Sequence, residues 1–353
     1  MTHRRAPRTV RGVLQRIVDS GRVPEPVLRA GIRAVCALRL LQERRRPPGY
    51  RPALIAELRR SEIAIAPEAA NAQHYEVPAA FFARVLGPHL KYSCAYWPAE
   101  AQTGVEALGA AEVAMLELTA ARAGLADGQA VLDLGCGWGA LTLWAAARFP
   151  RSRFTAISNA CSQRDHIAEQ ARRRGLSNLA VRVADVRTLE LPAGAFDRVV
   201  SIEMFEHMRN YQALLHRIAG WLAPGGALFV HVFAHRRHAY PFEDAGASDW
   251  MAREFFTGGL MPSVDLLRDF QDDLAINAEW WLDGSHYART AEAWYSNLMA
   301  HRAEAAELLG SRAAVERWRV FFLACAELFG FRGGHEWGVA HYRLERPRDA
   351  GTP

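Results

Sequence analysis

Two carboxylates and an imidazole fall within five residues of one another, at Glu203, Glu206 and His207. Ionisable side chains are costly to bury without a function, so we interpret the cluster as a site for binding or proton transfer. The i, i+3 and i+4 spacing would let one helical turn present all three to a single cavity. A capping cluster with an ordinary surface histidine is the alternative interpretation. Metal binding is a second alternative, but we expect no metal because the sequence offers no clear third ligand.

A glycine-rich turn precedes this cluster and follows a short apolar run. Residues 130–134, AVLDL, have the composition of a buried parallel strand, and Asp133 lies near its end. Gly135, Gly137 and Gly139 come next, and a helical pattern begins after them. Such glycines permit a tight turn and let backbone N–H groups approach a ligand closely. The sequence therefore predicts the opening of a nucleotide-binding α/β unit. The G-x-G-x-G spacing lacks the third glycine of the dinucleotide fingerprint and would also suit another Rossmann-like protein.

Strands and helices alternate after this turn, as they do in a doubly wound sheet. The expected strands are 130–134, 153–157, 179–183, 196–202, 227–233, 275–282 and 336–345, with a turn at 222–226 before the fifth. Ahead of the sheet, residues 9–47 show helical spacing that Pro24 and Pro26 divide into two helices. Residues 105–124 form a further amphipathic helix. The chain is therefore predicted to be an α/β protein with helices at its N-terminus.

The composition of the 353-residue chain narrows the class of protein. No apolar run is long enough to span a membrane, and the N-terminus lacks the apolar core of a secretory signal. Five scattered cysteines without a C-x-x-C pair indicate a reduced, cytoplasmic protein. Residues 1–60 hold fifteen arginines against four acidic residues, although the formal net charge of the whole chain is only +5. This basic arm could contact an anionic membrane or nucleic acid. A solvated helical face is the alternative.

Longer motifs carry a resemblance to a known family. They are HYEVPAAFF at 74–82, YSCAYW at 92–97, LDLGCGWGALTL at 132–143, SNACSQ at 158–163, FDRVVSIEMFEHM at 196–208, GGLMPS at 258–263, FQDDL at 270–274, HYARTAEAW at 286–294 and ELFGFRGGHEWGVAHYRLE at 327–345. From about Pro24 to Glu345 the chain resembles the cyclopropane-fatty-acyl-phospholipid synthase family of S-adenosylmethionine (SAM)-dependent methyltransferases. Within that family it is most similar to the branch that contains plant coclaurine N-methyltransferase.

The resemblance implies a Rossmann-like class I methyltransferase fold with a seven-stranded, mostly parallel sheet. Residues 1–125 would form a helical N-terminal extension that covers the acceptor site. Residues 126–353 would form the SAM-binding domain, with helical lid insertions at about 236–275 and 286–330.

A SAM site also follows from the resemblance, position by position. Its residues would be Tyr92 and Ser93 over the methionine part, Asp133, Gly135, Gly137 and Gly139 at the methionine carboxylate and backbone, and Ser158, Asn159 and Gln163 near the ribose and adenine. Asp185 follows the expected strand 179–183, where the ligands of such sheets bind. It would accept a hydrogen bond from the adenine amino group, and a helix N-cap is the alternative.

The resemblance leaves two acceptors open. If the acceptor is an amine, Glu206 and His207 would bind or deprotonate its ammonium. If it is the alkene of a lipid acyl chain, methylation leaves a carbocation, and in the cyclopropane synthases a bound bicarbonate removes a proton from the new methyl group. The positions that match the bicarbonate ligands are Cys94, Glu206, His231 and Tyr287. For Cys94 and His231 a packing role is the alternative. We favour N-methylation of a small-molecule amine over methylation of a lipid acyl chain.

The expected partners follow from these hypotheses. They are SAM as cofactor, an amine or a lipid acyl substrate, and bicarbonate on the lipid route. Nucleic acid is not expected, because no N/D-P-P-Y-type tetrad follows the strand at 196–202. We expect a cytoplasmic protein, and its arginine-rich N-terminus would allow peripheral contact at the inner membrane surface. A homodimer is also compatible with the sequence.

Overall fold

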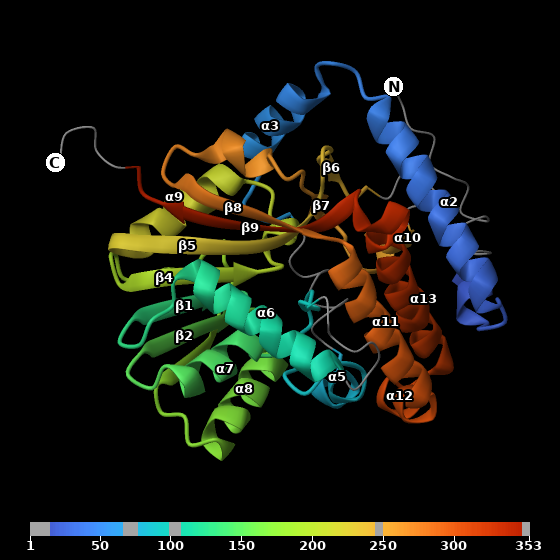
Figure 1. Ribbon diagram of the computed structural model, residues 1–353, viewed down its shortest axis with the longest axis horizontal. Helices are drawn as coiled ribbons and strands as arrows, with labels where there is room; N and C mark the ends of the chain where they lie inside the picture. The colour runs from blue at the N-terminus through green and yellow to red at the C-terminus, as the bar shows by residue number, and fades with distance from the viewer. Residues whose placement is uncertain (1–14, 66–76, 99–106, 244–249, 348–353) are drawn as a thin grey trace.

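A seven-stranded sheet forms the centre of the computed structural model, which describes residues 15–65, 77–98, 107–243 and 250–347 (Figure 1). The strand order is β3-β2-β1-β4-β5-β9-β8. All neighbouring pairs are parallel except those that β9 makes with β5 and β8. The expected class I methyltransferase fold is therefore confirmed. The strand order reverses between β1 and β4, which is where such sheets bind ligands at the carboxyl ends of the strands.

The observed strands agree closely with those expected from the sequence. They are β1 Ala130–Leu134, β2 Arg153–Ser158, β3 Leu179–Val183, β4 Phe196–Ile202, β5 Leu222–His235, β8 Ala275–Asp283 and β9 Trp337–Glu345, and a separate pair is formed by β6 Tyr240–Pro241 and β7 Leu260–Met261. The expected turn at 222–226 is an irregular start of β5. Its pairing with β4 shifts there, and Gly225 has a φ of 74°.

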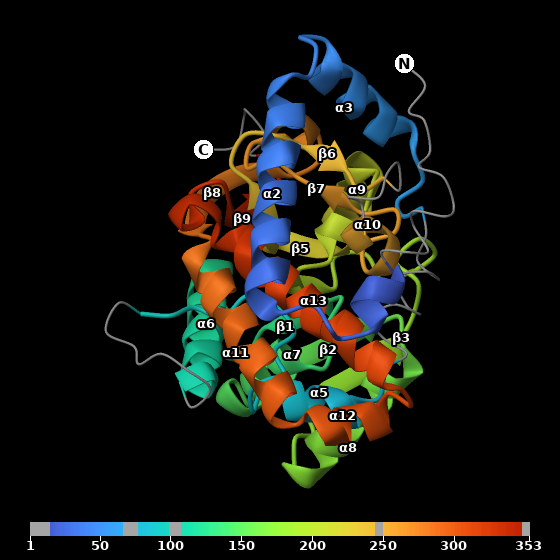
Figure 2. The same ribbon diagram turned by 90° about the vertical axis from the view of Figure 1, so that its right-hand side faces the viewer.

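Helices cover both faces of the sheet and gather beyond one end of it (Figures 1 and 2). The α-helices are α2 Glu25–Arg44, α3 Tyr50–Arg60, α5 Ala79–Val85, α6 Leu108–Ala123, α7 Ala140–Arg148, α8 Cys161–Arg173, α9 Tyr211–Trp221, α10 Trp250–Glu254, α11 Ser285–Ala300, α12 Arg302–Leu308 and α13 Arg312–Phe329. Helices α6, α7 and α8 form the layer on one face of the sheet, and α9 packs on β5 from the other. Helices α11 and α13 pack against each other and against β9, and α2 packs on α13.

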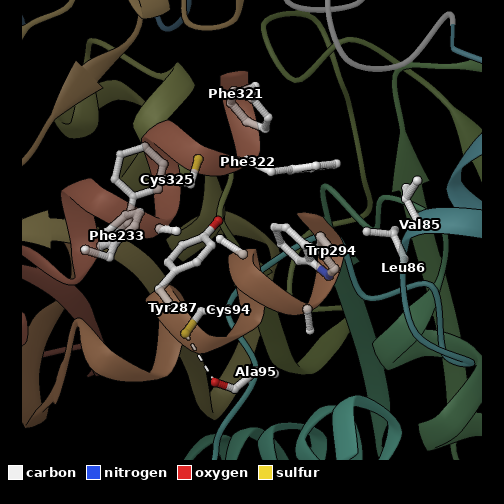
Figure 3. Close-up of a cluster of buried hydrophobic side chains, with 14 of the residues drawn as sticks. Val85, Leu86, Cys94, Ala95, Phe233, Tyr287, Trp294, Phe321, Phe322 and Cys325 are labelled. Carbon is white, nitrogen blue, oxygen red and sulfur yellow. Dashed lines mark hydrogen bonds between the residues drawn. The ribbon is translucent and has the colours of Figure 1, made fainter. Parts of the chain in front are cut away.

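An aromatic core joins these outer helices to the sheet. Tyr287 and Trp294 of α11 lie beside Phe322 of α13 (Figure 3). The Trp294 ring contacts Phe322, and the Tyr287 ring contacts Phe329 of the same helix. The rings of Tyr287 and Phe329 stack with their centroids 4.2 Å apart. Aromatic rings bury large apolar areas, so this packing fixes α11 rigidly beside the carboxyl ends of β4 and β5. Residues 286–330, expected as a lid insertion, therefore include a firmly packed helical wall. The division of the chain at residue 125 stays a prediction.

Four arginines of the N-terminal helices, Arg29, Arg33, Arg44 and Arg51, pair with acidic residues of the rest of the chain. Arg29 of α2 donates to Glu292 at 2.6 Å and to Glu327 at 2.9 Å. Arg51 of α3 donates to Asp265 at 3.0 Å and to Asp269 at 2.6 Å. The uneven charge of the sequence thus serves in part to dock α2 and α3. Residues 1–14, with four of the arginines, lie outside the described residues. None of the helices in the described ranges has the length and apolar character needed to span a bilayer.

Candidate active site

The glycine turn after β1 has the backbone conformation that the sequence predicted. Gly135, Gly137 and Gly139 have φ values of 84°, 53° and 82°, which side-chain-bearing residues rarely adopt. A Cβ on Gly135 would lie 2.8 Å from the Met204 side chain, so space is tight there. A Cβ on Gly137 would meet nothing within 4 Å, because this residue faces a cavity.

That cavity has a volume of about 270 Å³ and lies at the carboxyl ends of β1, β2 and β4. Nine of the ten expected cofactor residues line it: Tyr92, Ser93, Asp133, Gly135, Gly137, Ser158, Asn159, Gln163 and Asp185. Gly139 does not line it and instead precedes α7, where a Cβ would lie 2.7 Å from Ile167. The cavity is therefore bounded by four separate segments that the sequence analysis assigned to one ligand.

Two buried donors on the cavity wall have no hydrogen-bond partner within the described residues: Gln163 Nε2 and Trp138 Nε1. The oxygen of the Gln163 amide is already used, because Ser158 Oγ donates to it at 2.7 Å. Unpaired buried donors cost free energy, so they indicate a ligand with acceptor atoms. The hydroxyls of a nucleoside and the carboxylate of an amino acid have such atoms, so the residues fit SAM. Trp138 was not among the predicted site residues, although it is the tryptophan of the GWG motif.

The two aspartates of the cavity differ in their surroundings. Asp133 is buried and accepts a hydrogen bond from Thr142 Oγ1, and burial raises its pKa to about 6. Asp185 accepts the backbone N–H of Arg187 at 2.8 Å and its Nε at 2.8 Å. Partial burial opposes ionisation of Asp185, but the bonds from Arg187 hold its pKa below the usual value. Within the described residues Asp185 caps no helix. Because its pKa is lowered, its carboxylate is an ionised acceptor at the cavity edge.

Glu203 is the centre of a set of contacts at the other wall of the cavity. Its φ of 50° is rare for a residue with a side chain, and its backbone N–H donates to His231 O at 2.8 Å. Oε1 of Glu203 accepts the Cys94 N–H at 2.9 Å and faces His231 Nε2 at 3.2 Å. Oε2 accepts the Tyr287 hydroxyl at 2.6 Å. Burial raises the pKa of Glu203, whereas Lys91 and the donors of Cys94 and Tyr287 oppose that rise.

The sequence prediction that one helical turn presents the whole cluster to one cavity is wrong. Only Phe205–His207 form a helical turn, of the 3₁₀ type, and Glu203 precedes it in a left-handed conformation. Glu203 and His207 therefore line the cavity, while Glu206 is fully buried and does not. Phe233 N–H donates to Glu206 Oε1 at 2.6 Å, and Oε2 has no partner in the described part of the chain. Burial and the neighbouring Glu203 raise the pKa of Glu206 well above its usual value.

A buried lysine shapes the segment that carries Tyr92, Ser93 and Cys94. Lys91 is 1% exposed, lines the cavity, and donates from Nζ to Ser93 Oγ and to Cys94 O, each at 2.6 Å. These bonds hold the backbone that turns the Cys94 N–H toward Glu203. The sequence analysis did not select Lys91, although a charged residue inside an aromatic segment was a usable signal.

The four residues predicted to hold bicarbonate do not all face one point. Cys94, His231 and Tyr287 converge on the Glu203 carboxylate, and Glu206 faces Phe233 N–H instead. The Cys94 thiol itself donates to Ala95 O at 3.3 Å (Figure 3). The role of a bicarbonate ion stays a prediction. In the described ranges no cluster of three or more histidine, cysteine or acidic side chains could hold a metal.

Comparison with known proteins shows which protein family this chain belongs to. The family model described as mycolic acid cyclopropane synthetase matches residues 64–335. The chain belongs to this family. It is 40% identical to (S)-coclaurine N-methyltransferase of Thalictrum flavum over 310 residues, which cover 83% of each chain. It is 30% identical to cyclopropane-fatty-acyl-phospholipid synthase of Escherichia coli over 274 residues, which cover 77% of this chain and 67% of the relative.

Solved structures of family members agree with this assignment. A coclaurine N-methyltransferase bound to N-methylheliamine and S-adenosylhomocysteine (SAH) superimposes with a TM-score of 0.89 at 36% identity, covering 95% of this chain and 99% of that one. The mycolic acid cyclopropane synthase CmaA1, complexed with SAH and CTAB, gives a TM-score of 0.69 at 25% identity, covering 81% and 100%. The chain is a SAM-dependent methyltransferase, and its cofactor is SAM.

Proposed function

We propose that this methyltransferase transfers the methyl group of SAM to the nitrogen of a small-molecule amine. The observation that carries the proposal is the Glu203 carboxylate at the cavity wall. Its oxygens accept hydrogen bonds from the Cys94 N–H, from His231 Nε2 and from the Tyr287 hydroxyl. A fixed internal carboxylate is suited to a cationic ammonium and its proton. The high identity to relatives named as N-methyltransferases supports the same choice.

SAM supplies an electrophilic methyl group, and the protein must provide an uncharged nitrogen lone pair in line with it. Glu203 attracts the ammonium and accepts its proton, because the carboxylate lies on the cavity wall and its raised pKa favours proton uptake. His207 lines the same cavity and orients the amine from the side of Phe256, on which its ring stacks at 5.9 Å. These residues therefore bind, orient and deprotonate the acceptor.

Glu206 has a different role in this mechanism from the predicted one, which was to bind or deprotonate the ammonium. Two adjacent buried carboxyls cannot both ionise easily, and the one with more hydrogen-bond donors ionises first. Both oxygens of Glu203 accept hydrogen bonds, whereas Oε2 of Glu206 has no partner within the described residues. Glu206 therefore carries a proton while Glu203 is ionised, and it limits the negative charge beside the acceptor.

Calorimetric titration of the SAH-loaded enzyme with a small tetrahydroisoquinoline amine tests this function. Binding is expected, because the ionised Glu203 carboxylate on the cavity wall attracts the ammonium. Glu203→Gln keeps the shape of the side chain and removes its charge, so amine affinity should fall about 10-fold or more while SAH affinity is preserved. Equal affinity in wild type and Glu203→Gln would contradict the role of Glu203.

Methylation of an unsaturated acyl chain is the second candidate function. The residues Cys94, Glu206, His231 and Tyr287 are all present, and the E. coli relative named as a cyclopropane synthase matches most of the chain. Against it, three of these residues are engaged by Glu203. A cytoplasmic location, membrane contact through the N-terminal arginines and a homodimer stay predictions.

A further inference from the structure

A row of ring side chains crosses the sheet behind Glu203. Strand register pairs His231 of β5 with His341 of β9, and His341 in turn with Trp280 of β8. His341 Nε2 lies 2.9 Å from His231 Nδ1, and both rings are fully buried. Arg122 of α6 reaches His341 Nδ1 at 2.8 Å, and its guanidinium stacks on Trp280 at 4.9 Å. A continuous hydrogen-bonded chain therefore runs from Arg122 through both histidines to Glu203.

The chemistry of arginine fixes the direction of every bond in this chain. A guanidinium only donates hydrogen bonds, so His341 Nδ1 must accept. His341 then carries its proton on Nε2 and donates it to His231 Nδ1, which leaves His231 to donate from Nε2 to Glu203 Oε1. Turning either ring over would break two of these bonds, because both nitrogens of each histidine are engaged.

We propose that Arg122 and His341 are positioning residues, which hold His231 as the Nε2–H donor to Glu203 and so keep this carboxylate ready to accept the proton of the acceptor amine. The proposal rests on the proposed function for the role of that proton. Its structural part, the fixed proton position on each histidine, does not depend on the acceptor.

Because every hydrogen bond in this chain has a fixed direction, a proton on Glu203 cannot leave through the histidines. A proton on Glu203 could leave through His231 only if Nε2 were free of hydrogen, and the end of the chain would have to be an acceptor. Arg122 keeps its protons at any physiological pH and cannot take another. The proton from the amine must therefore leave on the cavity side, where His207 lies.

The burial and the charges around His231 and His341 favour the neutral form of both imidazole rings. Burial lowers the pKa of His231, and Lys91 and Arg122 lower it further. Burial, His231 and Arg122 act in the same direction on His341. The titratable groups that face Glu203 from the surrounding elements are Lys91, Cys94, Glu206, His231, Tyr287 and Cys325. Of these, His231 is the one whose proton position is set from outside the site.

The first test is the pH dependence of kcat/KM for an amine acceptor. His341→Phe keeps a buried ring but breaks the chain, so the acid limb should move to higher pH by about one unit. His341→Gln places an amide donor near the original Nε2 and should restore most of the wild-type profile. Tyr342→Phe removes the hydroxyl of the next residue on β9, which donates to Val264 O, and serves as the control. It should leave the limb in place. An unmoved limb in folded His341→Phe would overturn the proposal.

The second test needs neither an acceptor nor a stable core variant. Nitrogen-15 NMR of histidine-labelled wild-type enzyme with SAH should show His231 and His341 as neutral rings with the proton on Nε2. Arg122→Met, a change near the protein surface, should release His341 into a mixture of both tautomers. A wild-type His231 protonated on Nδ1 would overturn the proposal, whichever acceptor the enzyme uses. Failure of the amine assay alone would instead count against the proposed function.

Discussion

The hydroxyl of Tyr287 donates a 2.6 Å hydrogen bond to Oε2 of Glu203, and this bond ties helix α11 to the end of strand β4. Tyr287 is itself held by stacking on Phe329 of α13. The carboxylate is thus fixed from the helical side by a residue whose own position is set by the aromatic core. Preorganisation of this kind keeps a charged group in place without reorganisation during the reaction.

Replacing Tyr287 with phenylalanine should shift the pH profile without abolishing activity. A hydrogen bond to the ionised carboxylate favours the charged form, so its loss raises the pKa of Glu203 further. The acid limb of kcat/KM should therefore move to higher pH by about one unit or somewhat more. Cys94→Ser is the control, because Cys94 contacts Glu203 through its backbone N–H and should leave the limb unchanged. A steep loss in both variants, partly reversed by bicarbonate, would instead favour the lipid route.

Glu206→Gln should stabilise the protein, and increasingly so at higher pH. The folded-state pKa of Glu206 is raised, so the wild type loses stability as pH rises from the unfolded value of about 4.3 through the folded value. The glutamine variant has no such loss. Denaturant unfolding at about pH 5.5 and pH 8 measures the difference in free energy of unfolding between the variants.

The control for this experiment is Glu327, a carboxyl group whose pKa is shifted in the opposite direction. Burial raises the pKa of Glu327, but Arg33 and Arg29 lower it more, so its net pKa is lowered. Its contribution to stability is therefore present above the unfolded pKa and is lost as pH falls. Glu327→Gln should therefore destabilise the protein by a similar amount at about pH 5.5 and pH 8, and by less only below about pH 4. Parallel pH trends for the two variants would show that the pKa of Glu206 is not raised.

Gly137→Val should abolish SAM binding because its side chain would occupy the cavity. Gly137 has a φ of 53° and open space beyond its Cα, so valine introduces both backbone strain and bulk. Gly175→Val is the matched control, since Gly175 has a φ of 67° and also meets nothing within 4 Å, but it lies after α8, outside the cavity. Calorimetry with SAH should detect no binding in the first variant and normal affinity in the second. Normal affinity in a folded Gly137→Val protein would exclude this turn as the cofactor site.

Arg29→Met should loosen α2 from the helical wall. Arg29 donates to both Glu292 and Glu327 and is only 18% exposed, so we expect a loss of about 1–2 kcal/mol in the free energy of unfolding. Arg84→Met is the control, because the single Arg84–Glu304 pair is exposed on both sides and should contribute about 0–1 kcal/mol. If the N-terminal helices cover the acceptor site, Arg29→Met should also raise the acceptor KM. A change in SAM affinity instead would point to another role for these helices.

The sequence predicts the sheet well and the site only in part, for physical reasons. Buried parallel strands are short apolar runs between turns, so β1 and β4 stand out locally. The contacts of Glu203 join residues far apart in sequence, and only the family resemblance brought Tyr287 into the site. His341 and Arg122 were missed, because their contact with the site depends on the register of β5, β9 and β8 and on the helix above. The left-handed conformation of Glu203 has no local signal, so the helical-turn model failed there.

The most direct test of the account is a competition between two acceptors for one labelled methyl group. The purified enzyme receives methyl-labelled SAM together with a small tetrahydroisoquinoline amine and vesicles of a phospholipid with unsaturated acyl chains. We predict that the label enters the amine as an N-methyl group, and that Glu203→Gln reduces this transfer about 100-fold or more. Label in a cyclopropane ring of the phospholipid, with none in the amine, would contradict the account.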